Sequence, residues 1–287
     1  MAIITHPACV TYEMPGHPEA PFRVRDTVAH LTTTDLAIQW VEAVPAPKAA
    51  VLLAHEPEHL DHLEAEIDAF DGDTPRYPQI DQHAKRAAGA ALQALEMVRE
   101  NASTPPFSLM RPPGHHATQD RAMGFCYLNH VAIAALSALQ NGYERVAVYD
   151  FDVHHGNGTE AILHAVEGAS FYSIHQHPCY PGTGTHSFDN CHNYPVPPHG
   201  PRQRHRDACA KAMETMLSEK PELIIVSAGF DAYEQDPLAQ GTFTVEDYHW
   251  LGEELRRSTI PFFSVLEGGY SRDLPKLIEA YLRGTGA

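Results

Sequence analysis

The sequence predicts an α/β protein with a mainly parallel sheet that helices cover on both faces, in a three-layer α/β/α arrangement. Two observations support this prediction. Short runs rich in Val and Ile alternate with segments of helical periodicity, as expected of strands buried on both faces. The 287 residues also suit one large core, and no internal repeat or linker divides them. We therefore expect a single domain over residues 1–287.

The expected elements follow in chain order from the spacing of their apolar residues. Helices are expected over 24–31, 56–70, 81–100, 129–140, 202–217, 245–256 and 274–282, and strands over 107–110, 146–151, 170–175, 223–228 and 262–266. Asn129 is a favourable N-cap for the helix that follows it. The Pro- and Gly-rich segment 177–202 is expected to form an ordered surface loop.

The composition argues against several kinds of partner. The 37 acidic and 20 basic residues give a formal net charge of -17, which repels phosphate backbones, so we expect no nucleic-acid partner. No apolar run approaches the ~20 residues of a membrane span, and residues 1–10 show no signal segment. The five cysteines include no CxxC pair, so we expect a reducing, cytoplasmic setting. The oligomeric state does not follow from the sequence.

Polar clusters follow the predicted strands at their carboxyl ends, where open parallel sheets place their sites. The clusters in chain order are His115 with His116, the segment 150–157, His175, Asp231 and Tyr270. Because the five strand ends belong to one sheet, we expect these clusters to converge on one pocket.

Asp152, His154 and Asp231 are the candidate metal ligands. Asp152 and His154 are two residues apart, so on an extended strand end both side chains point to one side. Asp231 follows the strand 223–228 and could supply a third ligand. Three protein ligands with one open position are typical of catalytic zinc. The alternative is an Asp-x-His turn with ordinary hydrogen bonds, which the convergence of the other clusters disfavours.

Two further features could carry out chemistry beside a metal. His115 and His116 follow two prolines and a glycine, and a neutral imidazole can accept a proton from water near neutral pH. Asp150 and Asn157 are natural partners to orient these rings. Tyr270 follows two glycines, and a neutral phenol is a good donor to an oxyanion. The alternatives are an exposed histidine pair and a tyrosine packed on the surface.

These segments together resemble the histone deacetylase family, including its bacterial amidohydrolases and acetylpolyamine deacetylases. The shared motifs are RPPGHH at 111–116, GFCYLN at 124–129, DFDVHHGNG at 150–158, PGTG at 181–184, SAGFD at 227–231 and LEGGY at 266–270. The resemblance implies an arginase-like α/β fold with about eight mainly parallel strands. It also implies a zinc-dependent deacetylase, which hydrolyses N-acetyl amides to a free amine and acetate.

The resemblance also implies roles for individual residues. It assigns zinc to Asp152, His154 and Asp231, the general base to His116, and an electrostatic or acid role to His115. Tyr270 becomes the oxyanion donor. A structural potassium ion would be held by Asp150, Asp152, His154 and Ser173, with the carbonyl of Ile174. Asn157 and Glu267 stand where class I members have Asp and Gly.

The substrate residues come from the same resemblance. Phe125 and Tyr180 match the walls of an acyl-lysine tunnel, and Gly124 offers a carbonyl to the substrate amide. Asp73 matches a rim aspartate, and Arg23 matches the arginine of an internal acetate channel. Leu238 offers an apolar contact in the loop after the third ligand, which leads us to expect acetyl-lysine-like substrates over acetylated polyamines.

Two other functions remain open from the sequence. An arginase-type ureohydrolase needs two manganese ions and a DxHxD motif, whereas the order here is DxDxH. A non-catalytic acetyl-lysine binding module would need neither His116 nor Tyr270. Acetylated proteins, acetylpolyamines and small acetylated metabolites all remain open as substrates.

Overall fold

A computed structural model describes residues 1–65, 68–100 and 102–287 of the chain. The strands of the described residues are β1 Ala2–Thr5, β2 Gln39–Glu42, β3 Phe107–Ser108, β4 Val146–Asp150, β5 Ala169–Gln176, β6 Cys191–Val196, β7 Leu223–Ala228 and β8 Phe262–Leu266. They form one eight-stranded sheet in the order β2-β1-β3-β8-β7-β4-β5-β6, and neighbouring strands pair in parallel. The predicted parallel α/β class is confirmed.

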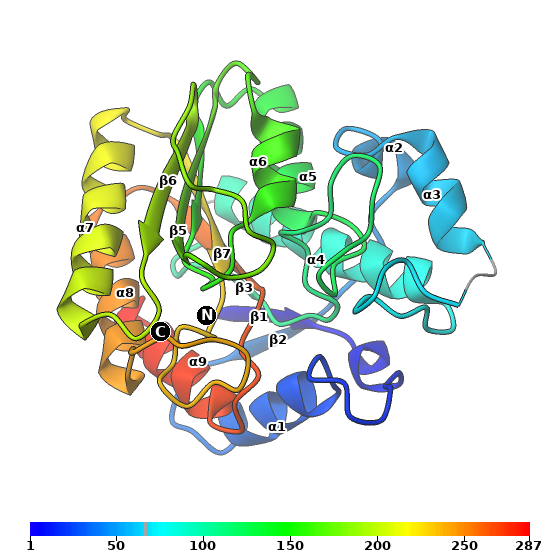
Figure 1. The fold of residues 1–287 in the computed structure, drawn as a ribbon, viewed down its shortest axis with the longest axis horizontal. Helices are drawn as coiled ribbons and strands as arrows, with labels where there is room; N and C mark the ends of the chain where they lie inside the picture. The colour runs from blue at the N-terminus through cyan, green and yellow to red at the C-terminus, as the bar shows by residue number, and fades with distance from the viewer. Residues whose placement is uncertain (66–67, 101) are drawn as a thin grey trace.

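Helices lie on both faces of this sheet. Their bounds are η1 Pro7–Val10, α1 Phe22–Leu31, α2 Lys48–Val51, α3 Pro57–Glu64, α4 Ile80–Arg99, α5 His130–Gln140, α6 Asn157–Leu163, α7 Arg202–Ser218, α8 Val245–Arg257 and α9 Leu274–Gly284. Helices α4, α5 and α6 pack on one face, and α1, α7, α8 and α9 lie across the other (Figure 1). This is the expected three-layer arrangement.

The central strands consist mainly of apolar residues because both of their faces are covered. Every residue of β4, β7 and β8 is buried, which accounts for their runs of Val, Ile and Phe. Helix α5 begins as predicted, with the Asn129 side chain accepting a hydrogen bond from the Ala132 N–H at 3.0 Å. None of the helices in the described residues is long and apolar enough to cross a membrane.

Some predicted elements need correction. The segment 177–202 is not loop throughout, because it contains β6, an edge strand whose sequence CHNYPV lacks an apolar run. The helix predicted over 56–70 ends at Glu64, where Ala65 turns to extended backbone; residues 66–67 lie outside the described residues. The sequence also gave no prediction for β1, β2, α2 or the short α6, whose few residues carry little periodicity.

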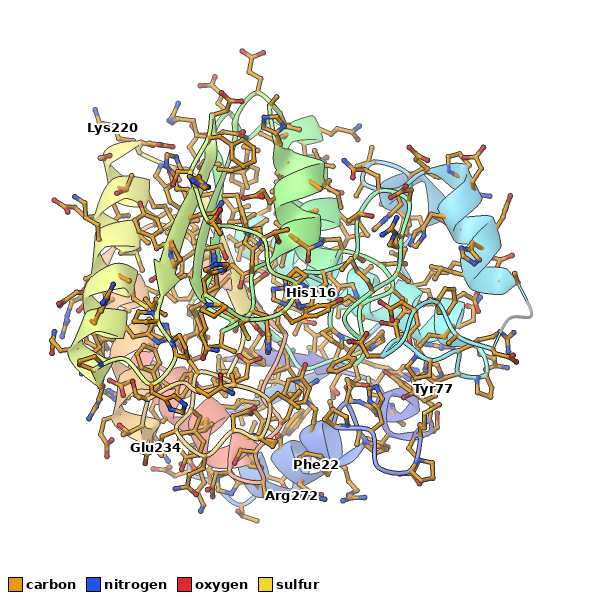
Figure 2. The ribbon with its side chains drawn as sticks, in the orientation of Figure 1. Phe22, Tyr77, His116, Lys220, Glu234 and Arg272 are labelled. Carbon is orange, nitrogen blue, oxygen red and sulfur yellow. The ribbon has the colours of Figure 1, made fainter. Side chains whose placement is uncertain are left out.

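The strand order brings four polar segments together. Strands β3, β8, β7 and β4 are consecutive neighbours in the sheet, so the segments that follow their carboxyl ends meet at one edge. Figure 2 shows His116, which follows β3, near the middle of the molecule, whereas Lys220 and Arg272 lie at its margin. His175 is the exception among the predicted clusters, because it lies inside β5 and its ring is fully buried.

Candidate active site

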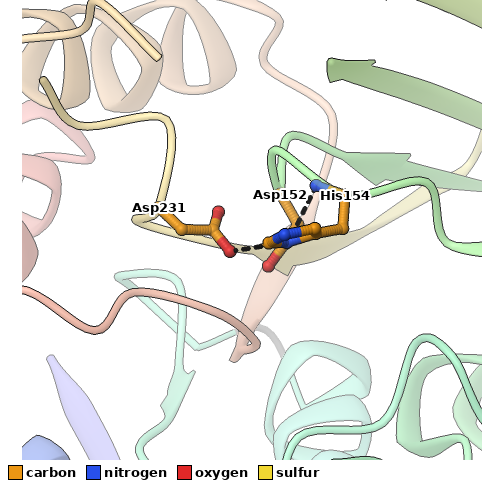
Figure 3. A group of neighbouring side chains, drawn as sticks. All are labelled: Asp152, His154 and Asp231. Carbon is orange, nitrogen blue, oxygen red and sulfur yellow. Dashed lines mark hydrogen bonds and ion pairs between the residues drawn. The ribbon is translucent and has the colours of Figure 1, made fainter. Parts of the chain in front are cut away.

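Asp152, His154 and Asp231 meet beyond the ends of β4 and β7 (Figure 3). The Nδ1 atom of His154 lies 3.0 Å from Asp231 Oδ2 and 3.2 Å from Asp152 Oδ1. One ligand atom from each residue lies within 4.8 Å of the other two. Both carboxylates are fully buried and His154 is 9% exposed. One nitrogen and two carboxylate oxygens converging in this way form a donor set that suits zinc.

The surrounding backbone holds the two carboxylates in place. The Gly268 N–H donates to Asp152 Oδ2 at 2.7 Å, and the Val153 N–H donates to Asp231 Oδ1 at 2.9 Å. A Cβ at Gly268 would lie 2.0 Å from Asp231 Oδ2, and one at Gly229 would lie 2.1 Å from Asp152 Oδ2. Glycine is therefore required where these two turns approach the carboxylates of Asp152 and Asp231.

His116 has the tautomer of a potential base. Its Nδ1–H donates to Asn157 Oδ1 at 2.7 Å, which leaves Nε2 with a free lone pair. Burial and the neighbouring imidazoles of His115 and His154 lower the pKa of His116 well below its ordinary value. The ring is thus held neutral, and Asn157 orients it as the sequence analysis expected.

His115 lies in a different electrostatic environment. Its Nδ1–H donates to Asp150 Oδ2 at 3.0 Å. Burial alone would lower the pKa of His115, but the carboxylates of Asp152 and Asp150 outweigh it and raise the pKa to about 10. The two adjacent histidines, with ring centroids 4.1 Å apart, therefore favour opposite charge states.

A pocket of about 190 Å³ opens onto this group. Its lining residues are Asp73, His116, Gly124, Phe125, His154, Tyr180, Leu238 and Tyr270. All five predicted substrate residues are among them. The Tyr180 ring lies edge-on to His116, with centroids 5.0 Å apart, and Phe125 lies 5.8 Å from the Tyr270 ring. Aromatic walls of this kind suit an extended aliphatic chain.

Tyr270 reaches the pocket from the turn after β8. It is 8% exposed, so the surface-packed alternative is wrong. Burial raises the pKa of its phenol well above the ordinary value, so the hydroxyl keeps its proton at neutral pH. Arg23 lies beneath this turn, with its guanidinium carbon 4.7 Å from the centre of the Tyr270 ring and its Nε donating to Gly269 O at 2.7 Å.

The remaining predicted residues lie near the pocket without lining it. Asp150 is paired with Ser173 in the β4–β5 register, but the Ser173 hydroxyl bonds His175 Nδ1 at 2.9 Å. The Nε2 atom of His175 contacts Gly184 O at 2.9 Å, so its ring supports the loop after Tyr180 rather than the pocket. Cys126 is fully buried next to the pocket-lining Phe125.

Two buried carboxylates, Glu267 and Asp236, have roles that the sequence pattern does not reveal. Glu267 Oε2 accepts hydrogen bonds from the Gly114 N–H at 2.7 Å and the His115 N–H at 3.1 Å. Asp236 Oδ2 accepts from the Tyr270 N–H at 2.7 Å. Both act on backbone groups far away in sequence, so no local spacing reveals their roles. The one available signal was an acidic residue directly after the apolar run of β8.

The parallel sheet and the site at its carboxyl edge define an enzyme of the arginase/deacetylase fold class. Residues 17–284 match the family model described as Histone deacetylase domain. The chain belongs to the histone deacetylase family.

Individual relatives agree with this assignment. The chain is 36% identical to a probable deacetylase of Methanothermobacter thermautotrophicus, over 99% of this chain and 90% of that protein. It is 34% identical to a histone deacetylase-like amidohydrolase of Pseudomonas aeruginosa, over 89% and 73% of the two chains. A solved acetylpolyamine aminohydrolase from Burkholderia pseudomallei superimposes with a TM-score of 0.89 at 28% identity, covering 100% of this chain and 99% of that one. The chain is thus a deacetylase-type amidohydrolase, a hydrolase of linear amide bonds.

Proposed function

We propose that this enzyme is a zinc-dependent deacetylase, with one zinc ion per chain bound by Asp152, His154 and Asp231. The observation that carries the proposal is the convergence of these ligand atoms within 4.8 Å of one another, beside a pocket that His116 and Tyr270 also line. The glycines that leave room for the carboxylates support it. Bound there, zinc would supply Lewis-acid polarisation of the scissile carbonyl and of the attacking water.

His116 is proposed as the general base. With its Nδ1 proton held by Asn157, Nε2 is free to accept a proton from water and to return it to the leaving amine nitrogen. His115, whose charge is balanced by Asp150, adds positive potential beside the negative charge that develops at the carbonyl. The two rings are assigned different roles, proton transfer for His116 and electrostatic stabilisation for His115, because their environments favour different protonation states.

Tyr270 is proposed as the donor to the carbonyl oxygen. Its hydroxyl stays protonated and lines the same pocket as His116. A donor held in a buried pocket stabilises the developing oxyanion without reorganising water. Hydrolysis then gives the free amine and acetate.

We propose acetyl-lysine-like substrates over acetylated polyamines. Phe125 and Tyr180 enclose the aliphatic stem, Gly124 offers its carbonyl to the substrate amide, and Asp73 lies at the mouth. Leu238 lines the same pocket and adds an apolar contact. An enzyme selective for polyamines would gain from an acidic residue at this position, because a carboxylate would pair with the distal ammonium group.

Three further expectations belong to this proposal. A potassium ion would be held by Asp150 and Ser173 with the Ile174 carbonyl, supported by the register that pairs Asp150 with Ser173. Residues 1–287 would form one catalytic domain, supported by the single sheet that includes β1 and β8. A cytoplasmic location is supported by five cysteines that are all free thiols in the structure.

The test combines a metal count with hydrolysis of an acetyl-lysine peptide. Wild type should bind about one zinc per chain and release acetate. Asp231→Ala should lose both the metal and the activity, whereas Asp35→Ala, which removes an exposed carboxylate paired with Arg283, should keep both. Full metal occupancy and normal activity in Asp231→Ala would remove Asp231 from the site. Two bound manganese ions and release of urea would favour the ureohydrolase. Binding of the acetyl-lysine peptide without hydrolysis would favour the binding module.

A further inference from the structure

Asp236 is a buried carboxylate beside the pocket that the mechanism above leaves without a role. It is 7% exposed and follows the ligand Asp231 in the loop after β7. Its Oδ2 atom accepts from the Tyr270 N–H at 2.7 Å and from the Ser271 N–H at 3.2 Å. Its Oδ1 atom accepts from the Leu238 N–H at 2.9 Å. One side chain therefore ties two pocket-lining residues together.

The turn that carries Tyr270 needs such anchors. Gly268 and Gly269 precede the tyrosine, and Gly269 has φ of +115°, so the local sequence favours no single conformation. The Phe230 N–H binds Gly268 O at 3.0 Å, and Arg23 Nε binds Gly269 O at 2.7 Å. Asp236 binds the N–H of Tyr270 itself, at the residue whose phenol must reach the substrate.

We infer that Asp236 is a positioning residue, which fixes the Tyr270 phenol in the pocket by holding the backbone N–H groups of Tyr270 and Ser271. The inference rests on the proposed role of Tyr270 as oxyanion donor. Asp236 does not line the pocket, so it acts through Tyr270 rather than on the substrate.

The chemistry of the three contacts explains why a carboxylate is needed. All three partners are N–H donors, and an ionised carboxylate accepts at both oxygens. An asparagine has a single acceptor oxygen, which can hold Tyr270 and Ser271 but then turns its NH₂ group toward the Leu238 N–H. Asp236→Asn should therefore keep most of the anchoring, and Asp236→Ala should lose it.

The test is a double-mutant cycle with Tyr270→Phe on the zinc-loaded enzyme and an acetyl-lysine peptide. We expect Tyr270→Phe to lower kcat ~10²–10³-fold. Asp236→Ala should lower kcat about 10–100-fold, the range for residues that orient catalytic groups, with KM and zinc content close to wild type. In the Tyr270→Phe background, Asp236→Ala should change kcat by no more than about twofold. A residue that acts through Tyr270 has nothing left to position once the hydroxyl is gone.

Two further variants separate positioning from general destabilisation. Asp236→Asn should lower kcat by about threefold to tenfold relative to wild type, which is less than the loss expected for Asp236→Ala. In the Tyr270→Phe background, Asp236→Asn should leave kcat unchanged. If Asp236→Ala does not fold, the double-mutant cycle of Asp236→Asn with Tyr270→Phe tests the positioning role by itself. Asp247→Asn is the matched control, because Asp247 is also a buried carboxylate that accepts a backbone N–H, at the start of α8. It should lower the melting temperature and leave kcat unchanged.

The outcomes distinguish this inference from the proposed function. Effects of Asp236→Ala and Tyr270→Phe that multiply in the double variant would overturn the positioning role. An unchanged kcat in Tyr270→Phe would instead overturn the proposed role of Tyr270, whatever Asp236 does.

Discussion

Gly268 is the position where one added methyl group should most directly disturb metal binding. In Gly268→Ala the new Cβ would lie 2.0 Å from Asp231 Oδ2 and 2.5 Å from Asp152 Oδ2. Ordinary van der Waals contact begins near 3.4 Å, so the Asp231 oxygen must move by about 1.4 Å. A metal site tolerates ligand displacements of only about 0.2 Å. The substitution therefore displaces two of the three ligands at once.

The expected size of the effect follows from the cost of overpacking. Forcing a methyl group into a packed site costs about 1–3 kcal/mol. If this strain falls on the metal-bound state, zinc should bind roughly 5- to 150-fold more weakly, since every 1.4 kcal/mol is tenfold. Gly268 has no positive φ that alanine would have to adopt, so the effect reports contact with the carboxylates rather than backbone strain.

The assay is a competitive zinc titration against a chelator of known affinity, with elemental analysis of the purified protein. Gly72→Ala is the control, because a Cβ there meets nothing within 4 Å; its zinc affinity should equal that of wild type. A zinc affinity of Gly268→Ala protein within about twofold of wild type would refute the geometric reasoning, because a difference of that size is expected even for a substitution at an independent site.

Three other predictions follow from the site and its supports. His116→Ala should lower kcat ~10²–10⁴-fold while zinc content is unchanged, and wild-type activity would remove His116 from the mechanism. The kcat/KM for an acetyl-lysine peptide should exceed that for acetylputrescine at physiological ionic strength; a tenfold advantage for the polyamine, about 1.4 kcal/mol, would contradict the substrate proposal. Asn129→Ala removes the cap of α5 and the donations to Ala117 O and Thr159 Oγ1, both at 3.1 Å. It should cost about 2 kcal/mol and lower Tm by about 4–8 °C, whereas an Asn141→Ala control should shift Tm less.

The sequence predicted the central elements well because their signals are strong and local. Strands β4, β7 and β8 are buried along their whole length and consist mainly of apolar residues, and α4 keeps its helical periodicity over 20 residues. The edge strands were missed for the opposite reason. Strand β2 is largely exposed, and β6 contains a proline and alternates only weakly, so neither differs in pattern from a loop.

The candidate site shows a similar division. Asp152 and His154 could be paired from their spacing alone, and His116 and Tyr270 stood beside prolines and glycines that mark constrained turns. Asp236 and Glu267 could not be found in this way. Each one binds the backbone N–H of a residue more than thirty positions away, and such a contact depends on the strand order rather than on side-chain pattern.

The place of β8 in the sheet has a consequence for how the chain folds. It is the last described strand along the chain, yet it lies between β3 and β7. Before residue 262 is available, the described strands can form only two separate half-sheets, β2-β1-β3 and β7-β4-β5-β6. The histidine pair follows a strand of the first half, and the proposed metal-binding group follows strands of the second. Joining them requires contacts distant in sequence, which form late and slowly. Catalytic competence is thus expected only after β8 inserts, because a chain that stops before it lacks both the strand that joins the two half-sheets and the turn that carries Tyr270.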